Sequence, residues 1–187
     1  PVLMTELPTP RLEAPSRVSI AHIWRRAPMG VMGLVLNQWV SSVIFGMGAV
    51  YAAKLGMSVS EVAMFMGAIM AGGMVLQWPL GRISDLMDRR WVMGVASVGA
   101  VIVALLASRE TVAGTALYVY SFLFGGFALS QYSLVVALTH DHLRPNEIVP
   151  ASGTIVLLSG MVSVTGPLSV ALGMQVLGVS SFFLLLA

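Results

Sequence analysis

The 40 residues IVPASGTIVLLSGMVSVTGPLSVALGMQVLGVSSFFLLLA, residues 148–187, contain no aspartate, glutamate, lysine or arginine. About 20 apolar residues in a helix are enough to cross the roughly 30 Å hydrocarbon core of a bilayer. The run is therefore long enough for one helix that crosses and a second that turns back, and we expect the division at Gly173–Gly178. From Val176 to Ala187 a helix would reach only about 18 Å, so this second helix is expected to be incomplete.

Four further runs also lack these charged residues, and they are 27, 20, 18 and 29 residues long, the last counted from Thr111 to Thr139. A charged side chain at the centre of a bilayer helix costs about 2.5–3.5 kcal/mol on insertion scales, so uninterrupted runs of this length indicate membrane spans. We therefore expect an all-α integral membrane protein whose sixth helix is truncated. The expected spans are residues 28–53, 62–80, 91–108, 112–139, 149–172 and, in part, 176–187.

A polar leader, residues 1–27, precedes the expected membrane domain at 28–187. Prolines disfavour a helix in the first part of the leader. From Ser16 to Arg26 apolar residues alternate with arginines, which predicts a cytoplasmic linker ending in a segment that lies at the membrane interface. A disordered tail joined to a missing upstream part fits the same residues. The chain shows no signal peptide, and we expect it to be part of a longer protein.

Composition excludes several classes of function. Hydrophobic residues make up 57% of the chain and charged residues 10%, with mean hydropathy +0.90, whereas a soluble domain carries roughly 25% charged residues. The net charge is only +2 and the basic residues are scattered, which does not favour nucleic acid as a partner. There is no cysteine for a disulfide or a thiolate metal site, and no phosphate-binding loop for ATP. We expect no cofactor and no metal.

Basic residues are distributed unequally between the two ends of the expected spans. The leader and the second and fourth connections together hold eight arginines, whereas the opposite side holds only Lys54 and Arg109. Cytoplasmic loops of membrane proteins carry an excess of lysine and arginine. We therefore expect a multi-pass protein of the inner (plasma) membrane, with the leader in the cytoplasm.

The decapeptide GRISDLMDRR, residues 81–90, joins the second and third expected spans on the basic side. It resembles the signature loop of the major facilitator superfamily, which runs glycine, any residue, leucine, small, aspartate, arginine, any residue, glycine, arginine, basic. The residues that match are Gly81, Ser84, Asp85, Arg89 and Arg90. Leu86 and Asp88 depart from the pattern, and the loss of an arginine at Leu86 puts part of the charge network of the loop in question.

The residues of this loop suit a cytoplasmic latch that gates transport. Gly81 permits a tight exit and a close approach of helices, and Asp85 can cap a neighbouring helix. Arg89 and Arg90 can pair with carboxylates or with lipid phosphates. The alternative is an ordinary short loop, since such loops between membrane helices are charged and rich in turn residues.

Residues 141–153, with the small-residue helix that follows, resemble the fourth loop and fifth helix of the same family, particularly its bacterial YcaD-like group. The resemblance implies the C-terminal six-helix half of a twelve-helix transporter, which works with a missing N-terminal half on a small-molecule substrate. Gly166 and Pro167 would let the fifth helix flex during transport, and static helix packing is the alternative.

In this family the first and fourth helices of each half line the central cavity, which implies candidate substrate contacts here. The candidates share helical faces and are Asn37, Gln38 and Ser41 in the first span and Tyr120, Phe124, Phe127 and Gln131 in the fourth. Gln77 and Tyr132 rank below them. Packing between helices is the alternative for each. Because the spans carry no charge, a neutral or amphiphilic solute fits them better than an ion.

Two other functions remain open at this point. His140, Asp141 and His142 could serve as acid-base groups of a polytopic membrane enzyme that acts on lipid, although such residues at a helix end are more often interface residues than a metal site. The second is a membrane assembly protein that transports nothing. The transporter, which is not an enzyme, is the function that the resemblance favours.

Overall fold

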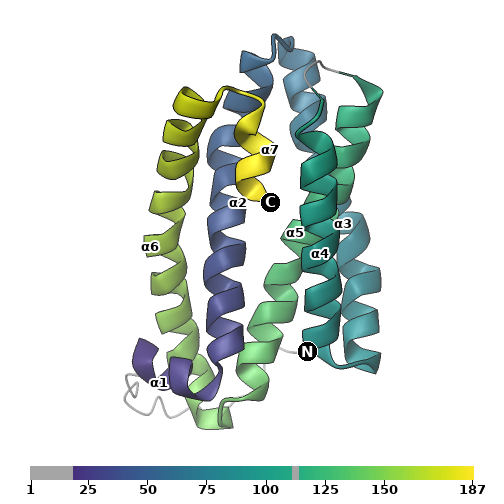
Figure 1. Ribbon diagram of the computed structural model, residues 1–187. Coiled ribbons are helices and arrows are strands. Elements are labelled where there is room, and N and C mark those ends of the chain that lie inside the picture. The colour runs from purple at the N-terminus through teal and green to yellow at the C-terminus, as the bar shows by residue number, and fades with distance from the viewer. Residues whose placement is uncertain (1–18, 111–113) are drawn as a thin grey trace, which may run out of the picture.

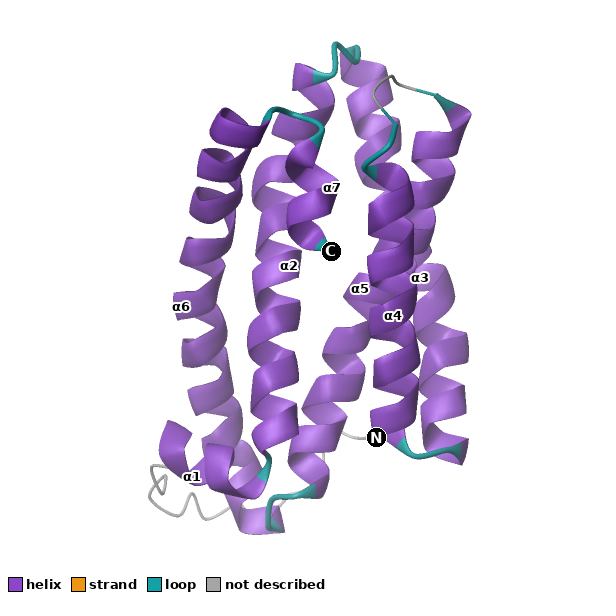
Figure 2. Cartoon of the chain, viewed as in Figure 1, coloured by secondary structure: helices purple, strands orange, loops and turns teal. Residues whose placement is uncertain are grey.

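The structure is a computed structural model that describes residues 19–110 and 114–187. Most of the leader expected at 1–27 lies outside these residues. Within the described residues the chain consists of helices and connecting loops (Figure 2). The helices are α1 (Ile20–Arg26), α2 (Pro28–Lys54), α3 (Val59–Leu86), α4 (Arg89–Ala107), α5 (Thr115–Asp141), α6 (Pro145–Leu177) and α7 (Ser181–Leu186) (Figure 1). By length and composition, α2 to α6 are able to cross a membrane.

The five long helices lie side by side in one bundle (Figure 1). Helix α5 is central, because it packs against α2, α3 and α4, while α6 packs mainly against α2. The α1–α2, α3–α4 and α5–α6 connections lie at one end of the bundle, and α6 turns into α7 at the other (Figure 1). The connections in which the sequence concentrates its arginines therefore share one end of the molecule.

Glycines bring α3 and α5 into direct backbone contact. A Cβ atom added at Gly72 of α3 would overlap the carbonyl oxygen of Phe122 in α5. A Cβ atom added at Gly125 of α5 would in turn overlap the carbonyl oxygen of Ile69 in α3. Membrane helices gain stability from close packing of this kind, since lipid offers little hydrophobic driving force between them. This crossing fixes α3 and α5 as one unit.

The last charge-free run turns at Gly178, at the far end of the expected Gly173–Gly178 division, so its first helix is longer than the expected one that ends at residue 172. Helix α6 continues without interruption from Pro145 to Leu177. It ends at Gly178, which has φ +90° and so adopts a conformation that other residues rarely take. Gly173 does not interrupt the helix, and its lack of a side chain leaves room for Leu185 of α7.

The short helix α7 is anchored by aromatic side chains. Phe182 stacks on Tyr51 of α2 with the ring centroids 4.5 Å apart. Phe183 meets Phe124 of α5 edge to face at 5.6 Å. Both phenylalanines are fully buried. Such pairs contribute beyond their buried area, so six helical residues suffice to hold α7 between α2 and α4.

Helix α1 lies at one end of the bundle and directly precedes α2 (Figure 1). Ser19 caps it by accepting a hydrogen bond from the His22 backbone N–H at 3.2 Å. Ile23 is 2% exposed and packs among core residues of α2, α5 and α6, whereas Trp24 is 45% exposed. One buried and one open side of this kind suit a helix that lies along the end of a membrane bundle.

Candidate functional site

The residues that resemble the signature loop are mostly helical. Helix α3 runs through Gly81 to Leu86, so only Met87 and Asp88 connect it to α4. A Cβ atom added at Gly81 would meet nothing within 4 Å, so the tight exit and close helix approach expected there are not found. The turn comes at Met87 because Asp88 can cap the next helix, while the residues before it continue α3.

Asp88, rather than Asp85, caps the neighbouring helix. Its carboxylate accepts a hydrogen bond from the Arg90 backbone N–H at 2.9 Å, at the N-terminus of α4. Aspartate is among the best N-capping residues. The sequence offers a signal for this cap, since Asp88 lies three residues before the apolar run that begins at Trp91, but the comparison with the family pattern identifies Asp88 only as a departure.

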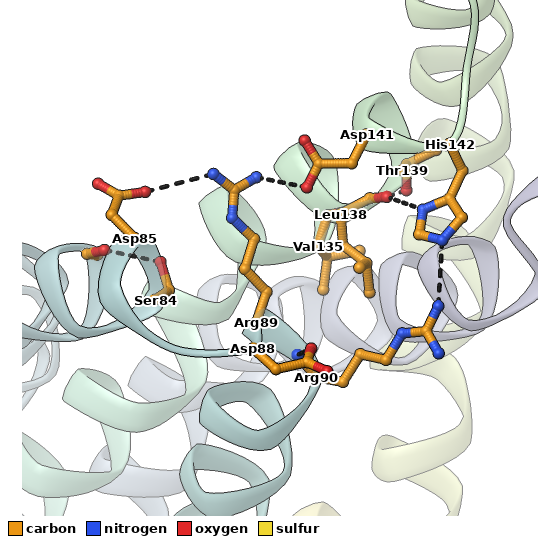
Figure 3. A network of polar contacts seen from close by, with 11 residues as sticks. Ser84, Asp85, Asp88, Arg89, Arg90, Val135, Leu138, Thr139, Asp141 and His142 are labelled. Carbon is orange, nitrogen blue, oxygen red and sulfur yellow. Dashed lines mark hydrogen bonds and ion pairs between the residues drawn. The ribbon is translucent and has the colours of Figure 1, made fainter.

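Arg89 links the ends of three helices. Its Nη1 donates to Asp141 Oδ2 at 2.9 Å, and its Nη2 donates to Asp85 Oδ1 at 3.3 Å (Figure 3). Asp85 lies near the end of α3, Arg89 begins α4 and Asp141 ends α5. The Arg89 side chain is 26% exposed, and those of Asp85 and Asp141 are 70% and 53% exposed. Exposed ion pairs contribute only about 0.2–1 kcal/mol each, so this network positions helix ends more than it stabilises the fold.

Arg90 makes a second link between α4 and α5. Its Nη2 lies 3.1 Å from Nε2 of His142, and Nδ1 of His142 lies 2.9 Å from the Leu138 carbonyl oxygen (Figure 3). Since a carbonyl only accepts, Nδ1 carries the hydrogen and Nε2 accepts from Arg90. His142 is thus held from both sides of its ring, by Arg90 and by the end of α5. Ser84, the remaining matching residue, is 5% exposed and donates to the Gly81 carbonyl at 2.7 Å.

An open cavity of about 600 Å³ lies over these residues and is lined by Asp85, Arg89, Asp141 and His142 among others. Asp141 faces Arg89 and His142 faces Arg90, so these two side chains do not converge with His140 on one centre. Nε2 of His140 is buried without a hydrogen-bond partner. The contacts of Asp141 and His142 are those of paired groups at helix ends.

The candidate residues of α2 point in different directions. Asn37 is 6% exposed and donates to the Ala128 carbonyl of α5 at 2.7 Å. Gln38 donates to the Ser163 hydroxyl of α6 at 2.8 Å. At about 100° per residue, Gln38 and the half-buried Ser41 lie on the side of α2 between its contacts with α5 and α6.

The four candidates of α5 are used largely in packing. Phe124 contacts α7, and the Phe127 ring lies against Gly99 of α4. Gln131 accepts a hydrogen bond from Ser97 of α4 at 3.1 Å. Tyr120 packs against the main core. A cavity of about 340 Å³ lies next to the last residues of α7, and its lining includes Asn37, Phe124 and Gln131.

The two lower-ranked residues are exposed instead. Tyr132 is 44% exposed, and Gln77 is also exposed. Tyr132 follows Gln131 by one residue, so it points about 100° away from the side chain that contacts α4. The spacing within α5 identified a shared face but could not show that α4 and α7 cover it.

Gly166 and Pro167 lie where α6 crosses α2. A Cβ atom added at Gly166 would come within 2.9 Å of the Trp39 carbonyl oxygen, and the Pro167 ring packs against Gly46. Helix α6 passes through both residues without a break. The contacts support the packing alternative for this pair, and flexing during transport remains a proposal.

A protein-family model described as the Major Facilitator Superfamily matches residues 30–187. The chain belongs to this superfamily. The resemblance recognised in the sequence, to the C-terminal six-helix half of the superfamily, is therefore confirmed, and so is the all-α membrane fold.

Relatives from several bacteria match the whole of this chain, and each is called "Uncharacterized MFS-type transporter YcaD". The relatives from Escherichia fergusonii and Salmonella arizonae are each 25% identical to it, and that from Salmonella paratyphi B is 24% identical. The chain spans about half, 48%, of the length of each of these relatives. No solved structure matches the chain.

Within this major facilitator half, the departures from the signature pattern leave the central pairing in place. Leu86 is 80% exposed, and Arg89 binds both aspartates without help from that position. Asp88 supplies a helix cap where the pattern has glycine. The contacts of Arg89 are therefore present, and only the contact that an arginine at position 86 would make is missing.

Proposed function

We propose that this chain forms the C-terminal half of a membrane transporter that moves a small solute by alternating access, with the Asp85–Arg89–Asp141 network as its cytoplasmic latch. The observation that carries the proposal is the position of Arg89, 2.9 Å from a carboxylate of α5 and 3.3 Å from one of α3. Membership of the major facilitator superfamily, and relatives that are named as transporters, support it.

The latch follows from the contacts at the cytoplasmic end. Arg89 joins the ends of α3, α4 and α5, so these ends move together while its two bonds are formed. Alternating access requires two states of similar free energy. Pairs worth about 0.2–1 kcal/mol are suited to this, since they bias the equilibrium without locking it. The missing N-terminal half would supply the surface against which the latch closes.

The proposed substrate contacts are polar side chains that the half does not fully bury. Gln38 and Ser41 share one side of α2, and Tyr132 and Gln77 are exposed on α5 and α3. The other candidates contribute by holding α2, α4, α5 and α7 in place. None of these positions carries a charge, which favours a neutral or amphiphilic solute. We place the protein in the inner membrane with α1 on the cytoplasmic side, where the arginines gather.

Replacing Asp85 with asparagine tests the latch. We expect solute flux through the full-length protein to fall about tenfold, while its abundance in the membrane stays within about twofold, because the pair is exposed and adds little stability. Uptake and efflux of a labelled metabolite panel in proteoliposomes measure the flux.

The matched control is Asp88→Asn, which removes one negative charge from the same connection but keeps the helix cap, since asparagine caps as well as aspartate. Equal losses of flux and abundance on Asp85→Asn would reduce Asp85 to a folding role. If the correctly inserted protein moved none of the solutes, the transport proposal itself would fail. The contacts of Asp141 and His142 give the lipid enzyme no observation in its favour.

A further inference from the structure

A small cavity lies at the cytoplasmic end where α1 meets α2, beside the latch. It has a volume of about 150 Å³, and its lining includes Arg26, Arg90 and His142. The first turn of α2 and Leu138 form the rest. At about 30 Å³ for each water of the liquid, the cavity has the volume of roughly five waters. One small polar group fits such a space.

The charge at this cavity is positive and not balanced nearby. Among the described residues, the guanidinium groups of Arg26 and Arg90 form no ion pair with a carboxylate within 4 Å. The Asp88 carboxylate accepts the Arg90 backbone N–H instead. Glu147 attracts Arg26 over a longer distance, but its carboxylate already accepts the Arg144 backbone N–H at 3.0 Å and lies 3.0 Å from His22. Two guanidinium groups at one cavity without a close anion indicate a site for an anionic ligand.

The backbone next to the cavity also offers donors. Ala27 precedes α2 and has no side chain that could cap it, so no side-chain acceptor bonds its first turn. Met29 and Gly30 of this turn line the cavity. Meanwhile His142 is already committed, since its Nε2 accepts from Arg90 and its Nδ1 bonds Leu138. The donors left for a ligand therefore belong to the two arginines and to this helix turn.

We propose that Arg26 and Arg90 bind a phosphate group in this cavity. A guanidinium presents paired N–H groups that match two phosphate oxygens, and two arginines on different helices fix the group from two sides. Basic pockets between membrane helices on the cytoplasmic side suit lipid headgroups, and Trp24 on α1 is 45% exposed, as interfacial tryptophans are. The phosphate can therefore come from an anionic lipid or from solution.

Melting of the full-length protein in phosphatidylcholine nanodiscs tests this site. The probes are short-chain phosphatidylglycerol and, separately, inorganic phosphate. Each variant is compared with itself without the probe, so that any direct effect of the substitution on stability cancels. The variants are Arg26→Gln and Arg90→Gln, and Arg25→Gln is the control, because Arg25 adjoins Arg26 in α1 but does not line the cavity.

We expect a probe to raise the melting temperature of the wild type and of Arg25→Gln, and its apparent Kd to increase about tenfold in Arg26→Gln and in Arg90→Gln. Arg26→Gln leaves both the latch and the Arg90–His142 bond intact, so its result does not depend on either. An effect of phosphatidylglycerol alone assigns the site to a lipid headgroup, and an effect of inorganic phosphate assigns it to a free anion. The proposal is overturned if neither probe stabilises the wild type, or if both cavity variants respond like Arg25→Gln.

Discussion

Replacing Gly72 with valine is expected to prevent stable assembly of the helical half. The Cβ atom of any other residue at this position would overlap the Phe122 carbonyl oxygen, which belongs to the backbone of α5 and cannot rotate away. Overpacking in a close-packed core costs about 1–3 kcal/mol, and a collision with backbone lies at the upper end of this range. We expect a lower melting temperature and loss of the monodisperse peak when the full-length protein is purified in detergent.

Gly67→Val is the matched control for this prediction. Gly67 lies on the same helix and undergoes the same change of side chain, but a Cβ atom there meets nothing within 4 Å. The two variants therefore share any effect of valine on the helix itself. If Gly72→Val and Gly67→Val melted at the same temperature, α3 and α5 would not be in backbone contact at this crossing.

Arg89→Gln is expected to impair transport more than any single change of its partners. The substitution breaks both ion pairs and leaves Asp85 and Asp141 without the cation between them. Like charges at close range repel, so the helix ends would separate as well as lose their link. We expect solute flux to fall by more than about tenfold, with a change of only about 1 kcal/mol in the free energy of unfolding.

Arg82→Gln serves as the control, because Arg82 lies at the same end of α3 but stacks over the Trp78 ring at 5.7 Å and pairs with no carboxylate among the described residues. Arg89→Lys separates charge from geometry, since one ammonium cannot reproduce the planar fork that spans two carboxylates. Its flux should fall between those of the wild type and Arg89→Gln. Equal flux in Arg89→Gln and Arg82→Gln would contradict the latch.

The sequence predicted the long helices because charge marks their ends. Lys54 and Glu61, for example, bracket the turn between α2 and α3. It did not predict that Gly81 to Leu86 would continue α3. Glycine, serine and aspartate are typical of turns, but the same residues also fit a helix whose aspartate pairs with an arginine four positions later, as Asp85 does with Arg89.

The sequence could predict only those features of the candidate site that depend on spacing within one helix. Asp141 lies 52 residues from Arg89, so their pairing depends on how α4 and α5 pack together. In α5 the spacing placed Phe124, Phe127 and Gln131 on one face, yet a single helix does not reveal which neighbour covers that face. Tyr132, one residue further, points about 100° away from Gln131 and is exposed.

The turn at Gly178 bears on how the protein is made. The insertion machinery of the membrane orients helices mainly by the lysines and arginines that flank them. Between α6 and α7 there is no such residue, because the whole run from 148 to 187 is without charge. Nothing in the charge pattern tells the translocon where α6 ends. The position of the bend is therefore set by the local backbone and not by charge, at Gly178, where glycine permits a φ of +90°.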